Sequence, residues 1–310
     1  MHDVRAVLER LSGRLVGRRR ELELVLAALE AGRHIVIEGP PGTGKSTLLR
    51  AVADELQVGF EFVEGNAELT PARLVGHFDP ARVLADGYDP SVFVDGPLVT
   101  AMRDGALLYL EELNRVPEET LNVLITVMSE RELHVPRLGR VVADPGFRLV
   151  AAMNPFDAVG TARISSAVYD RVCRLAVDYQ SAEEEAAIVD RAAPAADASW
   201  VERVVELVRR TRHHPDLRVG SSVRGALDAT AVVSTLAELR GRPPDSDAVG
   251  LDAVLVALSG RVRLREGSLR TAEEIVTDLW HEVFGPGRVS PNGDGAATGK
   301  ASAPTGASRS

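Results

Sequence analysis

The sequence predicts an α/β protein in which a parallel sheet is sandwiched by helices and is followed by a small all-α domain. From residue 4 to about residue 177, short apolar runs alternate with helical patterns, as is typical of a parallel sheet with helices on its faces. Beyond about residue 181 the strand patterns stop, and apolar residues recur at helical spacing. From Gly285 onward the chain is rich in Gly, Ala, Ser and Pro. We therefore expect an α/β domain at 1–185, a helical domain at 186–284 and a disordered tail at 285–310.

The elements follow from the apolar patterns in chain order. Strands are expected at residues 34–39, 60–65, 107–112 and 147–153. Helical patterns begin at Lys45 and Glu118, and a shorter one covers residues 165–171. In the second domain, helices are expected at residues 200–212, 221–240, 251–261 and 271–284.

The composition predicts a soluble, cytoplasmic protein. With 310 residues and 45% hydrophobic side chains, the chain can bury a sizeable core. Residues 1–11 are typical of an amphipathic helix without the apolar stretch of a secretory signal, and no segment approaches the roughly 20 apolar residues of a membrane span. A net charge of -9 argues against non-specific nucleic-acid binding. The single cysteine, Cys173, excludes an intrachain disulfide and is expected to fill space in the core.

The stretch GPPGTGKS, Gly39 to Ser46, has the spacing of a phosphate-binding loop. An apolar strand leads into it and a helical pattern leads out, so its glycines can turn backbone N–H groups toward anionic oxygens at a helix N-terminus. Lys45 can then reach the β- and γ-phosphates, and the Ser46 hydroxyl can bind magnesium. Kinases, GTPases, transporters and motors share this loop. Because the chain lacks an N-K-x-D guanine-reading motif, we expect adenine.

Two adjacent acids, Glu111 and Glu112, end the apolar run LLYLEE. In phosphate-loop NTPases a second strand ends in an acid that holds magnesium through its water shell. Successive side chains of a strand point in opposite directions, so Glu111 can serve the metal and Glu112 an attacking water. This pair resembles the Walker B motif of the additional-strand ATPases, which usually has aspartate first. Glu111 is one methylene longer.

Three further polar residues follow in an order expected of an ATPase. Asn154 comes directly after the strand at 147–153 and can orient a water beside a γ-phosphate. Arg171 lies at the end of a short helical pattern, and Arg224 lies at the start of a helix in the second domain. A single arginine in so arginine-rich a chain would indicate nothing. Because they follow the phosphate loop and the two glutamates in the order expected of an ATPase, these three residues are candidate catalytic residues.

Together these motifs resemble the AAA+ ATPases, and within them the MoxR family, close kin of the magnesium chelatase ATPase subunit. The resemblance covers about residues 15–263. It rests on LVGRRRE at Leu15 to Glu21, the phosphate loop, DGPLVTAM at Asp95 to Met102, EELNRVPEETLNVLITVMSERELHV, MNPFDAVGT, AVYDRV and SSVRGAL. The order EELNRVP, a helix ending in MSER, a loop pair and the MNP turn is specific to this branch.

The resemblance implies an ATPase that uses ATP and Mg²⁺. Asn154 would be sensor 1, Arg224 sensor 2 on a helical lid, and Arg171 the arginine finger supplied to a neighbouring subunit of a homohexameric ring, with Glu112 as the fourth catalytic residue. Ser46 and Glu111 would hold the metal. The family usually has phenylalanine after the finger, where this chain has Val172. The implied nucleotide-binding residues are Val16, Gly17, Gly39, Pro40, Pro41, Gly42, Thr43, Gly44, Lys45, Ser46 and Thr47, with Val16 and Gly17 bordering the adenine.

Relatives in the MoxR family commonly act with a von Willebrand factor A domain protein and help a client enzyme mature, often by assisting entry of a metal or cofactor. The segment from Phe78 to Pro97 resembles the insertion in helix 2 where such ATPases meet partners, and His134 to Gly146 resembles the hairpin before sensor 1. Glu64 or Asn66 is a candidate link between partner binding and Glu112. Three alternatives remain open: a motor subunit of a magnesium or cobalt chelatase, a DNA-associated motor, and a scaffold that binds ATP only to assemble.

Overall fold

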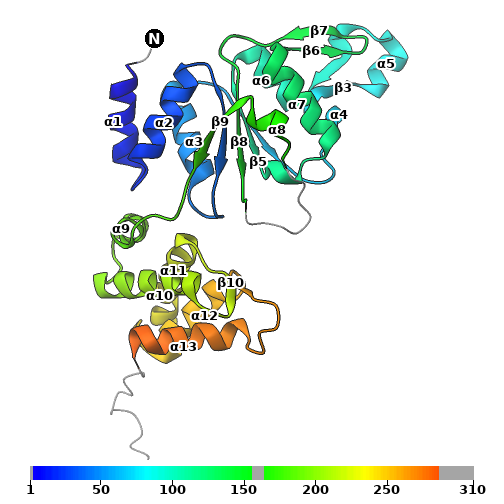
Figure 1. Cartoon of the computed structure of the whole chain (residues 1–310). Coiled ribbons are helices and arrows are strands. Elements are labelled where there is room, and N and C mark those ends of the chain that lie inside the picture. The colour runs from blue at the N-terminus through cyan, green and yellow to red at the C-terminus, as the bar shows by residue number, and fades with distance from the viewer. Residues whose placement is uncertain (1–2, 156–163, 286–310) are drawn as a thin grey trace, which may run out of the picture.

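The computed structural model describes residues 3–155 and 164–285, and its centre is a five-stranded parallel sheet in the order β2-β5-β8-β1-β9 (Figure 1). The strands are β1 (His34–Glu38), β2 (Phe60–Glu64), β5 (Leu107–Glu111), β8 (Arg148–Met153) and β9 (Val172–Ala176). The four expected strands and the parallel sheet are confirmed. The sequence did not predict β9, which pairs with β1 and forms one edge of the sheet.

Each face of the sheet buries a separate hydrophobic core, because successive strand residues point to opposite faces. On one face Ile35 and Tyr109 pack with the helices α1 (Val4–Arg14), α2 (Arg19–Glu30) and α3 (Lys45–Leu56). On the other, Val36 and Leu108 pack with residues from α4 (Pro71–Val75), α6 (Pro97–Asp104) and α7 (Glu118–Glu130). Figure 1 shows these two groups of helices on opposite sides of the sheet. The sandwich predicted from the sequence is therefore confirmed.

Two small hairpins extend from the second face of the sheet (Figure 1). In the first, β3 (Gly76–Phe78) pairs with β4 (Phe93–Asp95), and the connection contains α5 (Pro80–Asp86) and the 3₁₀ turn η1 (Pro90–Val92). The second pairs β6 (Glu132–Val135) with β7 (Gly139–Val142). The Arg137 guanidinium lies 3.6 Å from the centroid of the Tyr88 ring, so the tips of the two hairpins touch.

The C-terminal region has its own core around Trp200 and Trp280. Two short strands within it, β10 (Leu217–Val219) and β11 (Arg263–Leu264), pair antiparallel. The sequence predicts a purely helical region, and this detail is wrong because strands of two or three residues leave no periodic pattern. The helices are α9 (Ala182–Ala192), α10 (Ala198–His213), α11 (Val223–Arg240), the π-helical turn η3 (Asp247–Leu251), α12 (Asp252–Leu258) and α13 (Ala272–Phe284).

The expected division after residue 185 falls within α9, which packs on α10 and α11. It stays a prediction, and the tail beyond Gly285 lies outside the described residues. Cys173 is exposed, so its expected role in the core is wrong; it lies on the edge strand β9, which has a neighbour on one side only. Within residues 3–155 and 164–285, no helix combines the length and apolarity needed to cross a membrane.

A buried carboxylate fixes α9 to the remainder of the C-terminal region. Glu185 is 1% exposed, and its two carboxylate oxygens accept from Arg209 Nη1 at 3.2 Å and Arg212 Nη2 at 2.7 Å. The Arg212 side chain is 7% exposed and also donates to the Ser221 carbonyl at 2.8 Å. The carboxylate therefore neutralises a guanidinium that is almost out of contact with water.

We predict that Glu185→Ala lowers the free energy of unfolding of this region by about 3–5 kcal/mol, because Arg212 would remain buried without its counter-charge. Both tryptophans of the chain lie in the C-terminal core, so tryptophan fluorescence during urea unfolding reports on this region. Glu206→Ala is the matched control, because the Glu206–Arg210 pair is exposed and is worth less than about 1 kcal/mol. Equal losses in the two variants would contradict the prediction.

Candidate nucleotide-binding site

The phosphate loop leaves β1 at Glu38 and enters α3 at Lys45. Gly42 and Gly44 have φ of +76° and +81°, a left-handed conformation that residues with a Cβ rarely adopt. Gly44 is the N-cap of α3, so the loop turns directly into the positive end of a helix. A Cβ on Gly42 would lie 2.1 Å from Ser222 Oγ, which shows that the start of α11 closely approaches this loop.

Lys45 lies folded against its own loop. Its Nζ donates to the carbonyl oxygens of Gly39 at 2.9 Å and Pro40 at 2.8 Å. Burial lowers the pKa of Lys45 to about 8, while the nearby Glu111 and Glu112 carboxylates oppose this shift. An anionic ligand beside this amine would stabilise its charged form and raise its pKa again. The Lys45 amine is therefore suited to bind phosphate.

Ser46, in the first turn of α3, contacts Glu111 at the end of β5. The Ser46 hydroxyl donates to Glu111 Oε1 at 3.0 Å, and Tyr109 OH lies 3.2 Å from the same hydroxyl. Magnesium in nucleotide sites binds one or two protein groups and completes its shell with phosphates and water. A hydroxyl and a carboxylate at this distance fit that donor set. Among the described residues, no cluster of three or more His, Cys, Asp or Glu side chains could hold a metal.

Glu112 leaves the strand in a left-handed turn. Its φ of 58° is unusual for a residue with a side chain, a conformation that costs on the order of 1–3 kcal/mol. This turn, rather than the alternation expected along a strand, separates Glu112 from Glu111, because β5 ends at Glu111. The 3₁₀ turn η2 (Leu113–Arg115) follows, and Arg115 Nε lies 2.7 Å from Glu112 Oε2.

Asn154 follows the end of β8, between β1 and β5. Its carbonyl accepts from Asn114 Nδ2 at 3.4 Å. Asn154, Glu111 and Glu112 open onto one cavity of about 570 Å³ between the sheet edge and the C-terminal region. The lining residues are Pro41, Gly42, Thr43, Gly44, Lys45, Ser46, Glu64, Glu111, Glu112, Arg115, Ala152, Met153, Asn154, Arg218, Val219, Arg224, Arg261 and Arg263.

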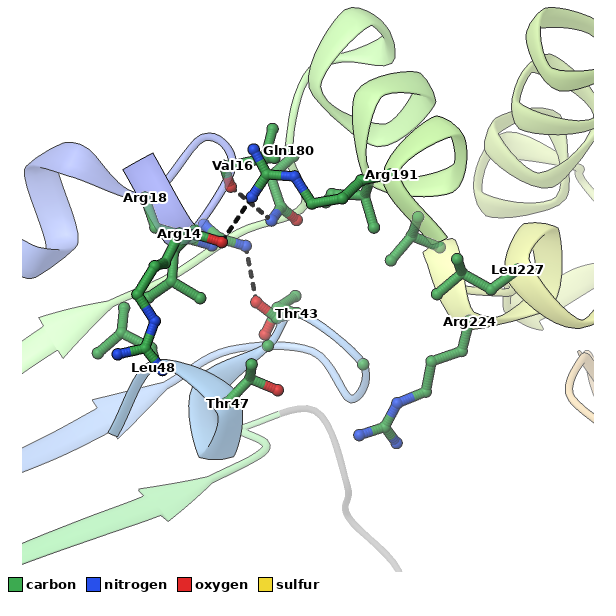
Figure 2. A pocket seen from close by; sticks show the side chains of 15 residues that line it. Arg14, Val16, Arg18, Thr43, Thr47, Leu48, Gln180, Arg191, Arg224 and Leu227 are labelled. Atoms are coloured by element: carbon green, nitrogen blue, oxygen red, sulfur yellow. Dashed lines mark hydrogen bonds between the residues drawn. The ribbon is translucent and has the colours of Figure 1, made fainter. Parts of the chain in front are cut away.

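A second cavity, of about 300 Å³, shares the phosphate loop and Arg224 with the first (Figure 2). Val16 and Thr47 line it together with the apolar side chains of Leu48, Ile188, Val223 and Leu227. An apolar slot beside a phosphate loop suits a planar base. Figure 2 shows Arg224 extending from α11 of the C-terminal region toward the phosphate loop.

Hydrogen bonds fix the walls of this second cavity, and Figure 2 shows those from Arg18 to Thr43 and from Arg191 to Arg14. Arg18 is 5% exposed and donates through Nη2 to the carbonyls of Thr43 and Asp178, both at 2.8 Å. Arg191 Nη1 donates to the Arg14 carbonyl at 2.6 Å, joining α9 to the end of α1. Arg18 thus links the phosphate loop to the segment that enters α9.

Four of the predicted residues do not line either cavity: Gly17, Gly39, Pro40 and Arg171. Gly17, at φ +66°, faces the Glu184 carboxyl group, and Gly39 and Pro40 form the base of the loop. Arg171 lies elsewhere, beside Ser129 Oγ, to which its Nε donates, and the Ala167 carbonyl, at 2.7 Å from its Nη1. The motif MNPFDAVGT falls partly outside the described residues.

Comparisons with known proteins agree with this geometry. Residues 34–172 match the model of the AAA domain, dynein-related subfamily. The chain is 29% identical over 215 residues to an uncharacterized protein of Staphylococcus aureus (strain NCTC 8325 / PS 47), covering 69% of this chain and 79% of that one. It is 27% identical over 216 residues to an uncharacterized protein of Staphylococcus epidermidis (strain ATCC 12228 / FDA PCI 1200), covering 68% and 81%.

Solved structures extend the likeness to the fold. A candidate ATPase from Cytophaga hutchinsonii aligns with a TM-score of 0.51 and 19% identity over 90% of this chain and 94% of that one. The RuvB Holliday junction branch migration motor of Thermotoga maritima aligns with a TM-score of 0.52 and 20% identity over 78% and 68%. The fold is that of an AAA+ phosphate-loop NTPase. In this AAA+ fold the loop, Glu111 and Asn154 occupy the carboxyl edge of the sheet.

The sequence did not identify several residues of the site. Arg115 belongs to the motif EELNRVP but has no role of its own in the prediction. Arg218, Arg261 and Arg263 lie in the second domain, which the sequence predicts to be all-helical. Arg18 lies in LVGRRRE, but three consecutive arginines give no signal as to which one is buried.

We predict that Lys45 titrates near pH 8. The chain has only two lysines, Lys45 and Lys300, so lysine labelled with ¹³C at Cε should give two resolvable NMR signals. The Lys45 signal should titrate near 8, below the ordinary lysine value of about 10.4. Lys45→Arg should remove this signal, and Lys300→Arg should leave it in place. A Lys45 signal that titrates near about 10.4 would contradict the burial of this amine.

Proposed function

We propose that this protein binds ATP with Mg²⁺ and hydrolyses it. The observation that carries the proposal is the contact of Ser46 with Glu111 at 3.0 Å, directly beside Lys45. The apolar slot next to the loop supports a purine base, and the cationic cavity supports its phosphates. No N-K-x-D motif is present to read guanine, which favours adenine.

In the proposed reaction the residues of the chain have separate roles. The backbone N–H groups of the loop and Lys45 bind and orient the phosphates, and Ser46 and Glu111 hold the metal. Bound magnesium would neutralise charge on the β- and γ-phosphate oxygens. Glu112 accepts a proton from the attacking water, which Asn154 orients, and Arg224 places a positive charge from the helical region near the terminal phosphate.

Arg171 supports a shared site between subunits. It does not line the cavity of its own chain, and its guanidinium lies with Ser129 at the far end of α7. A finger that stabilises the transferring phosphoryl group can come from a neighbouring molecule. We therefore propose a ring of identical subunits, with six as the expected number, in which Arg171 completes the site of the next subunit.

The proposed work of this ring is that of a MoxR-type chaperone. Its partner would be a von Willebrand factor A domain protein, and its client an enzyme that needs help to mature or to take up a metal or cofactor. The β3–β4 insertion supports a partner-facing role, because Leu84 is 90% exposed and Tyr88 52% exposed there. A DNA-associated role is less well supported, because Arg140 pairs with Glu132 and Arg137 stacks on Tyr88.

Two substitutions should separate binding from hydrolysis. Lys45→Ala should abolish ATP binding because the main phosphate-binding amine is lost. Glu112→Gln should bind ATP normally but hydrolyse it about 10²- to 10⁴-fold more slowly, because only the proton acceptor is lost. Fluorescent-nucleotide titration and steady-state phosphate release measure the two steps. Lys300→Ala is the control for loss of a lysine, and normal turnover by Glu112→Gln would refute the assignment.

Mixing two inactive variants should restore activity if sites are shared. Arg171→Ala should reduce turnover by about 10³- to 10⁵-fold, since the finger stabilises the transition state. A mixed ring can pair the intact Lys45 of one subunit with the intact Arg171 of the next, so Arg171→Ala mixed with Lys45→Ala should recover turnover. Phosphate release at a fixed total protein concentration measures this. No recovery at any mixing ratio, although the two variants co-assemble, would show that Arg171 does not act between subunits.

A further inference from the structure

The β10–β11 pair carries two arginines to the phosphate side of the site. Arg218 lies in the middle of β10 and Arg263 begins β11, opposite Val219. Both line the cavity that also contains Lys45, Ser46 and the two glutamates. The two strands belong to the C-terminal region, so these arginines line the wall of the cavity opposite the phosphate loop.

The turn that joins β10 to α11 is held by buried contacts. A Cβ on Gly220 would lie 2.5 Å from the Arg212 backbone nitrogen, so only glycine fits there. Ser221 N donates to Thr211 Oγ1 at 2.8 Å, and Arg212 Nε donates to the Ser221 carbonyl at 2.8 Å. Arg218 and Arg224 therefore lie on either side of one fixed turn. A displacement of this turn moves both arginines together.

The cavity holds an excess of positive charge. Its cations are Lys45, Arg115, Arg218, Arg224, Arg261 and Arg263, against Glu64, Glu111 and Glu112. Glu112 pairs with Arg115, and Asp228, outside the cavity lining, pairs with Arg261. Like charges gathered on one wall repel each other unless an anion lies between them and the opposite wall.

Within the described residues, the two arginines of the β10–β11 pair have no carboxylate partner. Within the described part of the chain, the Arg218 guanidinium has no hydrogen-bond or ion-pair partner, and it is exposed. Arg263 Nη1 donates to the carbonyls of Gly260 at 3.0 Å and Val262 at 3.4 Å, neither of which carries a neutralising charge. A planar guanidinium matches phosphate oxygens with paired donors.

We propose that Arg218 and Arg263 bind phosphate in addition to the phosphate loop and Lys45. From the helical region, they contact the terminal phosphate of the bound nucleoside triphosphate. This inference rests on the proposed function and adds residues to it. The pair adds to Arg224 and makes the position of the helical region depend on the third phosphate. A diphosphate, which is shorter, leaves the pair without a ligand. The β10–β11 pair thus serves to distinguish ATP from ADP.

The test compares two nucleotides on the full chain. Arg218→Ala, Arg263→Ala and the double variant are titrated with the non-hydrolysable analogue AMP-PNP and with ADP, both with Mg²⁺ and at one fixed salt concentration. Each single substitution should weaken AMP-PNP about tenfold, as expected for loss of one charge-assisted hydrogen bond, and should leave ADP within about twofold. Arg→Lys at either position should recover part of the affinity, since the charge remains but the paired donors do not.

A control variant separates a specific role of Arg218 and Arg263 from a general effect of losing a positive charge. Arg242→Ala removes an exposed arginine of the same region that does not line the cavity, and it should leave both affinities unchanged. Equal weakening of AMP-PNP and ADP, or no weakening of either, would overturn the proposal. If the unaltered chain binds neither nucleotide, the proposed function itself fails. Unfolding followed by tryptophan fluorescence checks that each variant retains the folded helical region.

Discussion

The site depends on one geometric constraint, which is that β1, β8 and β5 end together at one edge of a parallel sheet. The register pairs Glu38, the last residue of β1, with Met153, and Leu110, one residue before the end of β5, with Ala151, so β1 and β5 end close to each other on either side of β8. Gly39 N donates to the Met153 carbonyl at 3.2 Å, which extends this pairing into the phosphate loop. Only this convergence allows Ser46 to reach Glu111 from a distant part of the chain.

At two glycines near this edge, the backbone of a neighbouring segment comes too close to leave room for a side chain. A Cβ on Gly39 would lie 2.1 Å from the Val177 carbonyl, and one on Gly65 would lie 2.5 Å from the Glu112 carbonyl. These positions let the neighbouring strand ends approach without a side chain between them. The left-handed backbone at Glu112 belongs to the same crowded edge. Strain of this kind persists only where the surrounding structure holds it in place, as the sheet and η2 do here.

Buried charge connects this edge to the helical region. Arg18 donates to the phosphate loop at Thr43 and to Asp178 ahead of α9, and Glu185 then binds Arg212, which holds the turn before Arg224. These contacts join the phosphate loop, α9 and the turn before Arg224 through hydrogen bonds that are mostly shielded from water. Because such contacts are costly to break one at a time, α9 and this turn should move together.

The local sequence by itself determined the strands at residues 34–38 and 107–111, the phosphate loop and the candidate acids, because strand patterns and glycine spacing are local properties. It also indicated Asn154 and Arg224 through their positions after a strand and at a helix start. Only the tertiary structure decided that Arg218 and Arg263 face the loop, that Arg18 is the buried arginine of its triplet and that Cys173 is exposed. Those outcomes depend on contacts between residues far apart in the chain, and no local pattern records which distant side chains will meet.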